Sequence, residues 1–562
     1  MFAKRWLGVG AAAVTVALIS TAPAQAAGTN ARVTRDSTTG SYLRYNGTSD
    51  ATTQACSTGR RAQNEPTVAV DPHNINVVVA GSNDYCAAIV NGDVWAGYYR
   101  STDGGSTWRD SLVPGYPADT SPAGLASPVH GSCSAAGDPT QSFDSAGRAF
   151  YGFICFNRVK PINGSIYVSA YGSDGASYQR TVLVARGTPS GLFGAGLFQD
   201  KVNLAVDQTS GLHAGNVYVA WAQFNGFAPN NVILFSRSTD HGMTFSAPIR
   251  IAPVNVGGAE FADLAVGPDG NVYLTFRTFP SPSSPVNVIW LAKSTDGGAS
   301  FGAPVKVATF TPFDSSQFSG NGSQDCGDGP FTCPSGFTFE RFASLSAVAA
   351  DATGVHVVWS AERPGGQAKI FVRNSPDGVS WPTPASTLDP VTAGDQWFPD
   401  TASSNGVITV VFYDSRNDPA YSPQLPPGDT SGGMNSGGAV DTFIAQSADG
   451  GMTWSESRIT TVSSNFNWET HGSVRIPFWG DYIYVSSVPG ATNVAWTDSR
   501  NLVPGSDPRE SGSTDDRDGF DGFQTCAWVP DNINAPSYSW PSPGDPCLSQ
   551  GGLDQNIYQA RV

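Results

Sequence analysis

Two short segments of this chain share the sequence Asp-Ser-Arg-Asn, and those residue types suit chemistry on a sugar. Residues 413–417 read Tyr-Asp-Ser-Arg-Asn, and residues 497–501 read Thr-Asp-Ser-Arg-Asn. A carboxylate can move a proton in a general acid/base step, and a guanidinium fork can hold a substrate carboxylate. A structural role is the alternative, because Asp, Ser and Asn side chains also stabilise loops through local bonds to the backbone.

Further acidic residues recur where strands are expected to begin. Two carboxyl groups flanking one bond are what glycoside hydrolysis requires, one as acid and the other as base or nucleophile. Of these acids we expect Glu65, Asp138 and Asp481 to align with one another. The acids at strand starts are Glu65, Asp138, Asp200, Glu260, Glu340, Asp395 and Asp481, and those at strand ends are Asp84, Asp414 and Asp498.

These residues give a candidate site with two parts. A tyrosine beside an acid can replace the carboxylate nucleophile, so tyrosines next to the acids are included. The candidate catalytic residues are Asp414, Asp481, Asp498, Tyr413, Tyr482, Glu65 and Asp138. The candidate substrate-binding residues are Arg277, Arg416, Arg500 and Arg363, whose planar guanidinium groups match a carboxylate.

A repeated turn motif indicates which elements must position these residues. The motif reads Ser-x-Asp-x-Gly-x-x-Trp/Phe and occurs at 101–108, 238–245, 294–301, 375–381 (one residue shorter) and 447–454. Its glycines accept positive φ, as a tight hairpin needs, and its Ser and Asp can bond to the turn backbone. We therefore expect its acids to be structural. They are Asp103, Asp240, Asp296, Asp377 and Asp449.

The turn motif belongs to a longer unit of three strand signals, the turn and a fourth strand. Seven such units can be traced, with six as the alternative count. Four-stranded units repeated around an axis are typical of an all-β propeller. The seventh unit lacks its fourth strand, so an N-terminal segment (27–60) is expected to complete it, which would leave 61–562 as the propeller.

Strand order separates the two faces of such a propeller. The turn motif joins the third and fourth strands, so its copies lie on the face opposite the loops after the second and fourth strands. The long insertions 109–137, 302–342, 414–440 and 498–553 all fall in those loop classes. We expect function on the face with the long loops, because binding and catalytic residues concentrate on loops held by a rigid scaffold.

The repeated motif resembles the Asp-box, or BNR, repeats of the sialidase superfamily, of the secreted bacterial type. This resemblance runs from about Glu65 to Val562 and implies a β-propeller and a sialidase-like glycoside hydrolase acting on acidic glycans. The Phe/Tyr-Arg-Ile-Pro motif that sialidases carry before the first Asp box is absent there; Val-Arg-Ile-Pro occurs instead at 474–477. Two alternatives therefore stay open: a non-catalytic propeller that binds glycan or protein at the cell envelope, and a lyase acting on a uronate polysaccharide.

The remaining features concern location and ligands. Residues 1–26 read as a signal peptide, with Lys4 and Arg5 before an apolar run and a small-residue cleavage site, so the protein is expected to be secreted. A formal net charge of −16 argues against nucleic acid and membranes as partners. The arginines point to a glycan with carboxylate groups as the partner, and the protein is expected to be a monomer. No cofactor is required by these motifs, and no metal site is assigned, although the acidic run 515–521 leaves calcium open.

The cysteines predict disulfides, because an exported chain with eight of them normally pairs them. Spacing typical of a zinc site is absent from the sequence. The expected pairs are Cys56 with Cys86, Cys133 with Cys155, Cys326 with Cys333, and Cys526 with Cys547.

Overall fold

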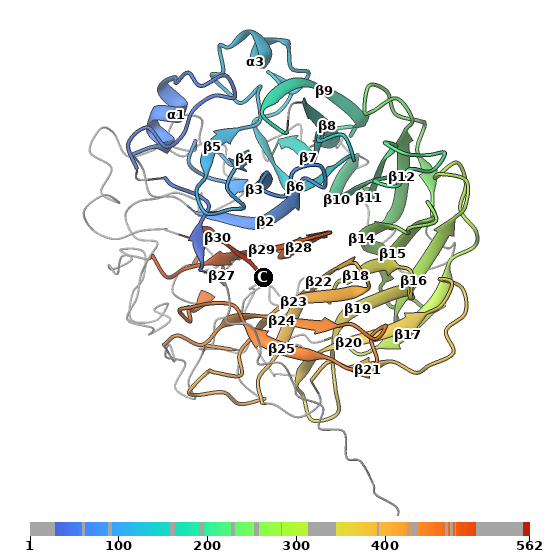
Figure 1. Cartoon of the computed structure of the whole chain (residues 1–562). Helices are drawn as coiled ribbons and strands as arrows, with labels where there is room; N and C mark the ends of the chain where they lie inside the picture. The colour runs from blue at the N-terminus through green and yellow to red at the C-terminus, as the bar shows by residue number, and fades with distance from the viewer. Residues whose placement is uncertain are drawn as a thin grey trace, which may run out of the picture.

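The structure is a computed structural model, and nearly all of its regular elements are β-strands (Figure 1). It describes residues 29–36, 38–58, 62–87, 93–157, 163–172, 174–189, 196–225, 231–251, 258–282, 284–312, 344–389, 393–423, 427–428, 437–466, 470–471, 476–477, 479–501 and 555–562. The predicted signal peptide, the run 515–521, Glu340 and the pairs Cys326/Cys333 and Cys526/Cys547 lie outside these residues.

The strands form antiparallel four-stranded units in which the first strand pairs with the second, the second with the third and the third with the fourth. The first strands are β2 (Gln63–Val70), β6 (Ala135–Phe143), β10 (Leu197–Val206), β14 (Ala259–Val266), β18 (Ser346–Asp351), β22 (Gln396–Ser404) and β28 (Tyr484–Val488). The second strands are β3 (Val78–Asp84), β7 (Ala149–Asn157), β11 (Val217–Asn225), β15 (Val272–Thr278), β19 (Gly354–Glu362), β23 (Val407–Asp414) and β29 (Ala491–Asp498).

The outer half of each unit is made by its third and fourth strands. The third strands are β4 (Trp95–Ser101), β8 (Asn163–Gly172), β12 (Val232–Ser238), β16 (Asn287–Ser294), β20 (Ala368–Ser375), β24 (Asp441–Ser447) and β30 (Asn556–Arg561). The fourth strands are β5 (Arg109–Leu112), β9 (Ser177–Ala185), β13 (Ile249–Arg250), β17 (Val305–Phe310), β21 (Ser386–Thr387), β25 (Ser455–Arg458) and β1 (Ala31–Arg32). The helices α1 (Ala51–Cys56) and α3 (Pro122–Ala126) and the hairpin β26 (Thr470–His471) and β27 (Ile476–Pro477) stand outside this scheme.

The first strands follow one another around a common centre. Along the chain, β2 contacts β6, β6 contacts β10, β10 contacts β14, β14 contacts β18, β18 contacts β22, β22 contacts β28, and β28 contacts β2. Figure 1 shows the sheets standing side by side around this centre, in chain order. A parallel pairing of Phe198 with Gly164 also links β10 to β8, so these two units join into one eight-stranded sheet.

Neighbouring first strands are tied by side chains that accept a hydrogen bond from the next strand's backbone. The Thr140 hydroxyl accepts from Leu204 N at 3.1 Å, and the Asp263 carboxylate accepts from Val348 N at 2.7 Å. Asn203 with Leu264 and Asp400 with Val485 repeat the arrangement at 3.1 and 2.7 Å. A buried N–H without a partner is costly, so these side chains satisfy backbone groups that have no ladder partner.

The five copies of the turn motif lie between the third and fourth strands of their units. In the copy at 294–301, Asp296 accepts bonds from the backbone N and the hydroxyl of Ser300 at 2.9 and 2.6 Å, and from the Ser294 hydroxyl at 2.8 Å. These bonds lower the pKa of Asp296 to about 2, although burial opposes them. The preceding unit also holds this turn, since Arg237 donates to the carbonyls of Asp296 and Gly297. The motif therefore fastens both the hairpin and the neighbouring sheet.

Segments from the two ends of the chain meet in one sheet. Strand β1 pairs antiparallel with β30 through Ala31 with Gln559 and Arg32 with Tyr558. Asn30, just before β1, donates to the Ile459 carbonyl at 2.8 Å and accepts from Thr461 N at 2.7 Å. The N-terminal segment thus supplies the fourth strand of the unit whose other strands are β28, β29 and β30.

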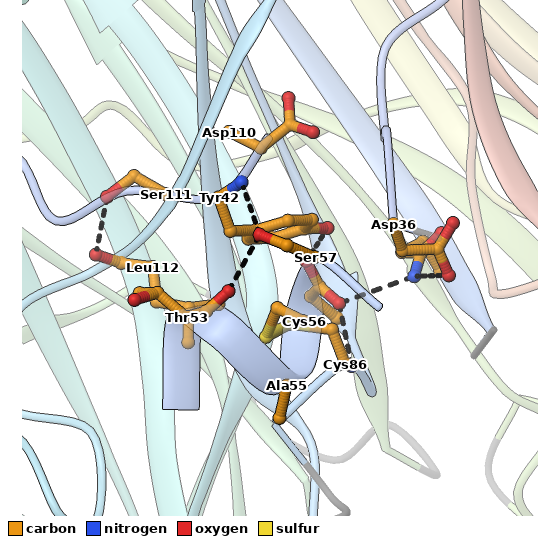
Figure 2. The surroundings of a disulfide bond; sticks show 12 residues. Asp36, Tyr42, Thr53, Ala55, Cys56, Ser57, Cys86, Asp110, Ser111 and Leu112 are labelled. Carbon is orange, nitrogen blue, oxygen red and sulfur yellow. Dashed lines mark hydrogen bonds between the residues drawn. A yellow bond between two sulfur atoms is a disulfide. The ribbon is translucent and has the colours of Figure 1, made fainter. Parts of the chain in front are cut away.

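Two of the expected disulfides are present. Cys56 at the end of α1 bonds to Cys86 just after β3, and Cys133 bonds to Cys155 in β7. Figure 2 shows Tyr42 and Ser57 beside the first bridge, where the Ser57 hydroxyl accepts from Tyr42 N at 3.0 Å. This bridge fixes α1 and the segment around it to the sheet of β2–β5.

None of the described helices is long and apolar enough to cross a membrane.

Candidate functional site

Five first strands contain an extra residue near their start, and this irregularity positions the candidate site. The strand register shifts between Asn64 and Thr67, and correspondingly in four other first strands. Such a bulge re-aims a side chain, and a bulky residue with positive φ is strained. The bulge residues with positive φ are Glu65 (53°), Asp138 (51°), Lys201 (53°), Phe261 (56°) and Phe398 (48°).

The register prediction for these acids was partly wrong. Glu65 and Asp138 share the bulge position as expected, but the third charged residue there is Lys201 and not Asp481. Asp481 lies before β28 and is absent from the positive-φ residues. A bulge adds one residue to a strand, so an alignment of the strands made by counting residues along the sequence is wrong by one position.

Lys201 brings acids from several sheets together. Its ammonium contacts the Asp481 carboxylate directly and lies 3.9 Å from Asp138 Oδ2. The Lys201 side chain is 10% exposed, and that of Asp481 is 1% exposed. We call Glu65, Asp138, Asp200, Lys201 and Asp481 the axial cluster.

Asn83, from β3, joins two members of the axial cluster. Its Nδ2 donates to Glu65 Oε2 at 2.8 Å, and its Oδ1 accepts from Asp138 N at 2.8 Å. One amide therefore fixes the carboxylate of the first sheet and the backbone of the second. This buried amide therefore holds the Glu65 side chain in a defined position relative to the Asp138 backbone.

Two carboxyl groups of the cluster titrate near neutral pH, well above the usual range for aspartate. Burial raises the pKa of Asp138 to about 7, helped by the charge of Glu65 and opposed by Lys201. Burial and the charge of Asp138 raise the pKa of Asp200 to about 7 as well. These two carboxyl groups also share a side-chain hydrogen bond, so their protons belong to the pair. A carboxyl group that stays protonated near neutral pH can serve as a general acid.

A buried tyrosine and a small cavity lie beside this cluster. Tyr482 lies next to Glu65 and Asp138, and burial followed by their charges holds its pKa well above the ordinary value for tyrosine. Lys201, Phe261 and Tyr482 line a cavity of about 60 Å³, together with Asp263 and Asp400. Towards the opposite face, a larger axial cavity of about 740 Å³ is lined by strand residues including Asp263, Asp400 and Tyr484.

The Asp-Ser-Arg-Asn segment at 413–417 forms its own network within one sheet. Asp414 is fully buried, and its carboxylate accepts from Arg416 Nε at 2.8 Å and from Gln396 at 2.8 Å. Arg416 also donates to Glu456 at 2.8 Å and lies over the Phe443 ring at 4.1 Å. Burial opposes the charge, but the bonds to Asp414 and Glu456 raise the pKa of Arg416.

The second segment, at 497–501, repeats this arrangement in the neighbouring unit. Asp498 accepts from Arg500 at 2.6 Å and from the Trp496 indole at 2.9 Å. Arg500 also donates to Asn30 at 3.2 Å and lies over the Tyr558 ring at 4.3 Å. Asp498 and Arg500 therefore tie the end of β29 to the N-terminal segment.

The other two predicted arginines lie in separate sheets. Arg277 is 1% exposed, donates to Asn287 at 2.7 Å and stands over the Phe279 ring at 4.4 Å. Arg363 is half-buried after β19, where its backbone N donates to the Gln367 carbonyl at 2.9 Å. Each arginine of the predicted set thus already has hydrogen-bond partners in the described structure.

Tyr413 packs into the core below the loops. Its ring lies 5.2 Å from that of Trp479 and 5.8 Å from that of Trp397, and its hydroxyl accepts from Thr497 N at 2.9 Å. The structure therefore brings Glu65, Asp138, Asp481 and Tyr482 together. Tyr413 lies instead beside Trp479, and Asp414 and Asp498 pair with the arginines of their own segments.

Sequence reasoning missed Lys201 and Asn83. Lys201 interrupts a series of acids at strand starts, directly after Asp200, and a lone cation in an acidic series was the available signal. Asn83 gave no such signal, because its role depends on β3 lying beside both β2 and β6. Among the described residues, no group of three or more His, Cys, Asp or Glu side chains is placed to hold a metal ion.

Comparisons with known proteins find similarity only among solved structures. No protein-family model matches the chain, and no curated protein does. A Hadza microbial sialidase aligns at 14% identity over 75% of this chain and 70% of its own, with a TM-score of 0.39. An α-L-arabinofuranosidase from Fusarium graminearum aligns at 13% identity over 69% and 94%, with a TM-score of 0.39. A Trypanosoma rangeli sialidase aligns at 13% identity over 70% and 58%, with a TM-score of 0.40.

Proposed function

We propose that this chain is a secreted seven-bladed β-propeller that hydrolyses glycosidic bonds in the manner of sialidase-like enzymes, with its active site at the axial cluster. The blade count is supported by the contacts among the first strands, which run from β2 around to β28 and back to β2. Closure by the N-terminal segment is supported by the pairing of β1 with β30, which places both chain ends in one sheet.

The observation that carries the proposal is the convergence of acidic side chains from different sheets on Lys201. Asp138 has a pKa raised to about 7, mainly by burial, and so provides the proton for the leaving oxygen. Asp481 contacts the Lys201 ammonium, which favours its ionised form, and so provides the base or nucleophile. One protonated and one ionised carboxyl group are the pair that glycoside hydrolysis uses.

Tyr482 has a secondary place in this scheme. Burial and the charges of Glu65 and Asp138 favour its neutral phenol, so it is a hydrogen-bond donor in the resting site. It becomes a nucleophile only when a base takes its proton, and Glu65 is the neighbouring group for that role. Replacing Tyr482 by Phe distinguishes these roles, because loss of a hydrogen-bond donor should lower the cleavage rate less than loss of the nucleophile.

The proposed preference for acidic glycans rests on the arginines. Arg416 and Arg500 already pair with the buried carboxylates of Asp414 and Asp498, so a substrate carboxylate would have to compete with these ion pairs. A neutral sugar needs no such competition. Substrates for the first test should therefore include both neutral and acidic glycosides.

A non-catalytic glycan-binding propeller is the second candidate, and burial of the acids is the observation that favours it. Glu65 is 2% exposed and Asp481 is 1% exposed, which suits a structural network as well as a reactive pair. Such a protein would bind glycans on an array and release them unchanged.

The test is turnover of chromogenic glycosides by purified protein, with a panel of neutral glycosides, sialosides and uronides. Cleavage that falls at least about 100-fold in Asp138→Asn and in Asp481→Asn supports the site, since a general acid contributes about that much. Asp414→Asn serves as the matched control in the other network. Binding without cleavage of any glycoside refutes the hydrolase. Equal cleavage by wild type and both axial variants refutes the site.

A further inference from the structure

Lys201 stands where the neighbouring sheets place acids. Glu65 in β2 and Asp138 in β6 occupy the same bulge position as Lys201 in β10, and all three have φ between 51° and 53°. A non-glycine residue rarely adopts this conformation without a compensating contact. At Lys201 the backbone N donates to Asp200 Oδ1 at 2.9 Å, and the side-chain ammonium contacts Asp481.

The ammonium is placed unequally between its two carboxylates. It contacts Asp481 directly, whereas Asp138 Oδ2 lies 3.9 Å away, beyond hydrogen-bond distance. That Asp138 oxygen is buried and has no hydrogen-bond donor in the described structure. A single positive charge therefore stabilises one carboxylate much more than the other.

The other groups that face the ammonium are acidic. Asp200 precedes Lys201 in the chain and shares a hydrogen bond with Asp138, Glu65 acts on Asp138 through its charge, and Tyr482 lines the same small cavity as Lys201. Lys201 is the cation among these groups. The proton that the cluster retains therefore goes to the carboxyl groups that the ammonium does not touch.

Resting on the proposed function, we propose that Lys201 is a positioning residue, which keeps Asp481 ionised and leaves the shared proton on Asp138 and Asp200. The lysine would then decide which acid donates the proton and which acts as base, without itself touching the substrate. In this assignment its charge is what matters, so arginine can replace it in part and a neutral side chain cannot.

The experiment uses the mature protein and two readouts. The first is the pH dependence of unfolding free energy from denaturant titration between pH 5 and 9. The second is the pH profile of kcat/KM on the glycoside that is cleaved best. An opposite charge within about 4–6 Å shifts a carboxyl pKa by 1–3 units, so Lys201→Met should move the midpoint of the stability curve up by about one pH unit or more. Lys201→Arg should restore most of that shift, and both limbs of the activity profile should move up in Lys201→Met.

Two further variants keep the outcome clear. Asp481→Asn removes an anion that raises the pKa of Asp138, so the midpoint should move down, and this variant serves if Lys201→Met does not fold. Lys293→Met is the matched control, because Lys293 donates to the Asp377 carbonyl in a turn motif and should leave the midpoint unchanged.

Stability curves of Lys201→Met and wild type that superimpose would overturn the positioning role. A protein that cleaves no glycoside would overturn the proposed function alone. The stability curves would then still show whether the Lys201 charge keeps the shared proton on Asp138 and Asp200.

Discussion

Replacement of Asp138 by asparagine should stabilise the fold at high pH while removing activity. In the folded protein the pKa of Asp138 is raised to about 7, chiefly by burial and the charge of Glu65, from an ordinary value of 3.8. Ionising it therefore costs roughly 4 kcal/mol of folding free energy at about 1.4 kcal/mol per pKa unit. This is an upper limit, because Asp200 shares the proton.

The sign follows from the raised pKa. Below pH 4 the carboxyl group is neutral in both the folded and the unfolded chain, so the variant and the wild type should have similar stability. As pH rises from 4 towards 7 the unfolded chain ionises first, and the wild type loses stability that the variant keeps. At pH 8 we expect Asp138→Asn to be more stable by about 2–4 kcal/mol.

Denaturant unfolding followed by tryptophan fluorescence at pH 4, 6 and 8 measures this difference, and turnover is assayed on the same samples. Asp395→Asn is the comparison, because burial and the charge of Asp414 raise the pKa of Asp395 to about 8 in a different network. It should gain stability at pH 8 without loss of turnover. An Asp138→Asn protein that is less stable than wild type at pH 8, or equally changed at pH 4 and pH 8, would refute the reasoning.

Three further predictions concern the scaffold. Asp296→Ala should lower the free energy of unfolding by about 1–2 kcal/mol at pH 7, a figure already reduced for solvent screening, and should leave turnover per folded molecule unchanged. Because the pKa of Asp296 in the folded protein is lowered to about 2, this contribution should disappear as the pH falls from 4 to 2. Thermal melts at several pH values measure it. Asp414→Ala should cost up to about 3 kcal/mol in denaturant titrations, because it removes the buried carboxylate that pairs with the half-buried Arg416 and accepts from Gln396, and an unchanged midpoint would contradict that role. Asn30→Ala should lower the thermal midpoint and speed limited proteolysis near the N-terminus, since Asn30 bonds to Ile459 and Thr461; equal cleavage rates would argue against closure by this segment.

The repeat and the place of its turns could be predicted from the sequence. Ser, Asp and Gly at fixed spacing specify a tight hairpin through local bonds, as seen around Asp296, and such bonds need no information from distant residues. The sequence also predicted that an N-terminal strand would complete the unit containing β30, because a repeated unit that lacks its last strand needs one from elsewhere. Two of the expected cysteine pairs are also present.

The tertiary structure alone decided which acids meet. The bulges shift the register by one residue, which placed Lys201 rather than Asp481 at the position of Glu65 and Asp138. Whether a carboxyl group meets a cation or another acid depends on how neighbouring sheets are rotated about the axis, and a linear sequence does not contain that angle. Asp414 and Asp498 pair with Arg416 and Arg500, which lie two residues further along the chain. The axial cluster instead brings together residues that are more than 400 positions apart, such as Glu65 and Asp481.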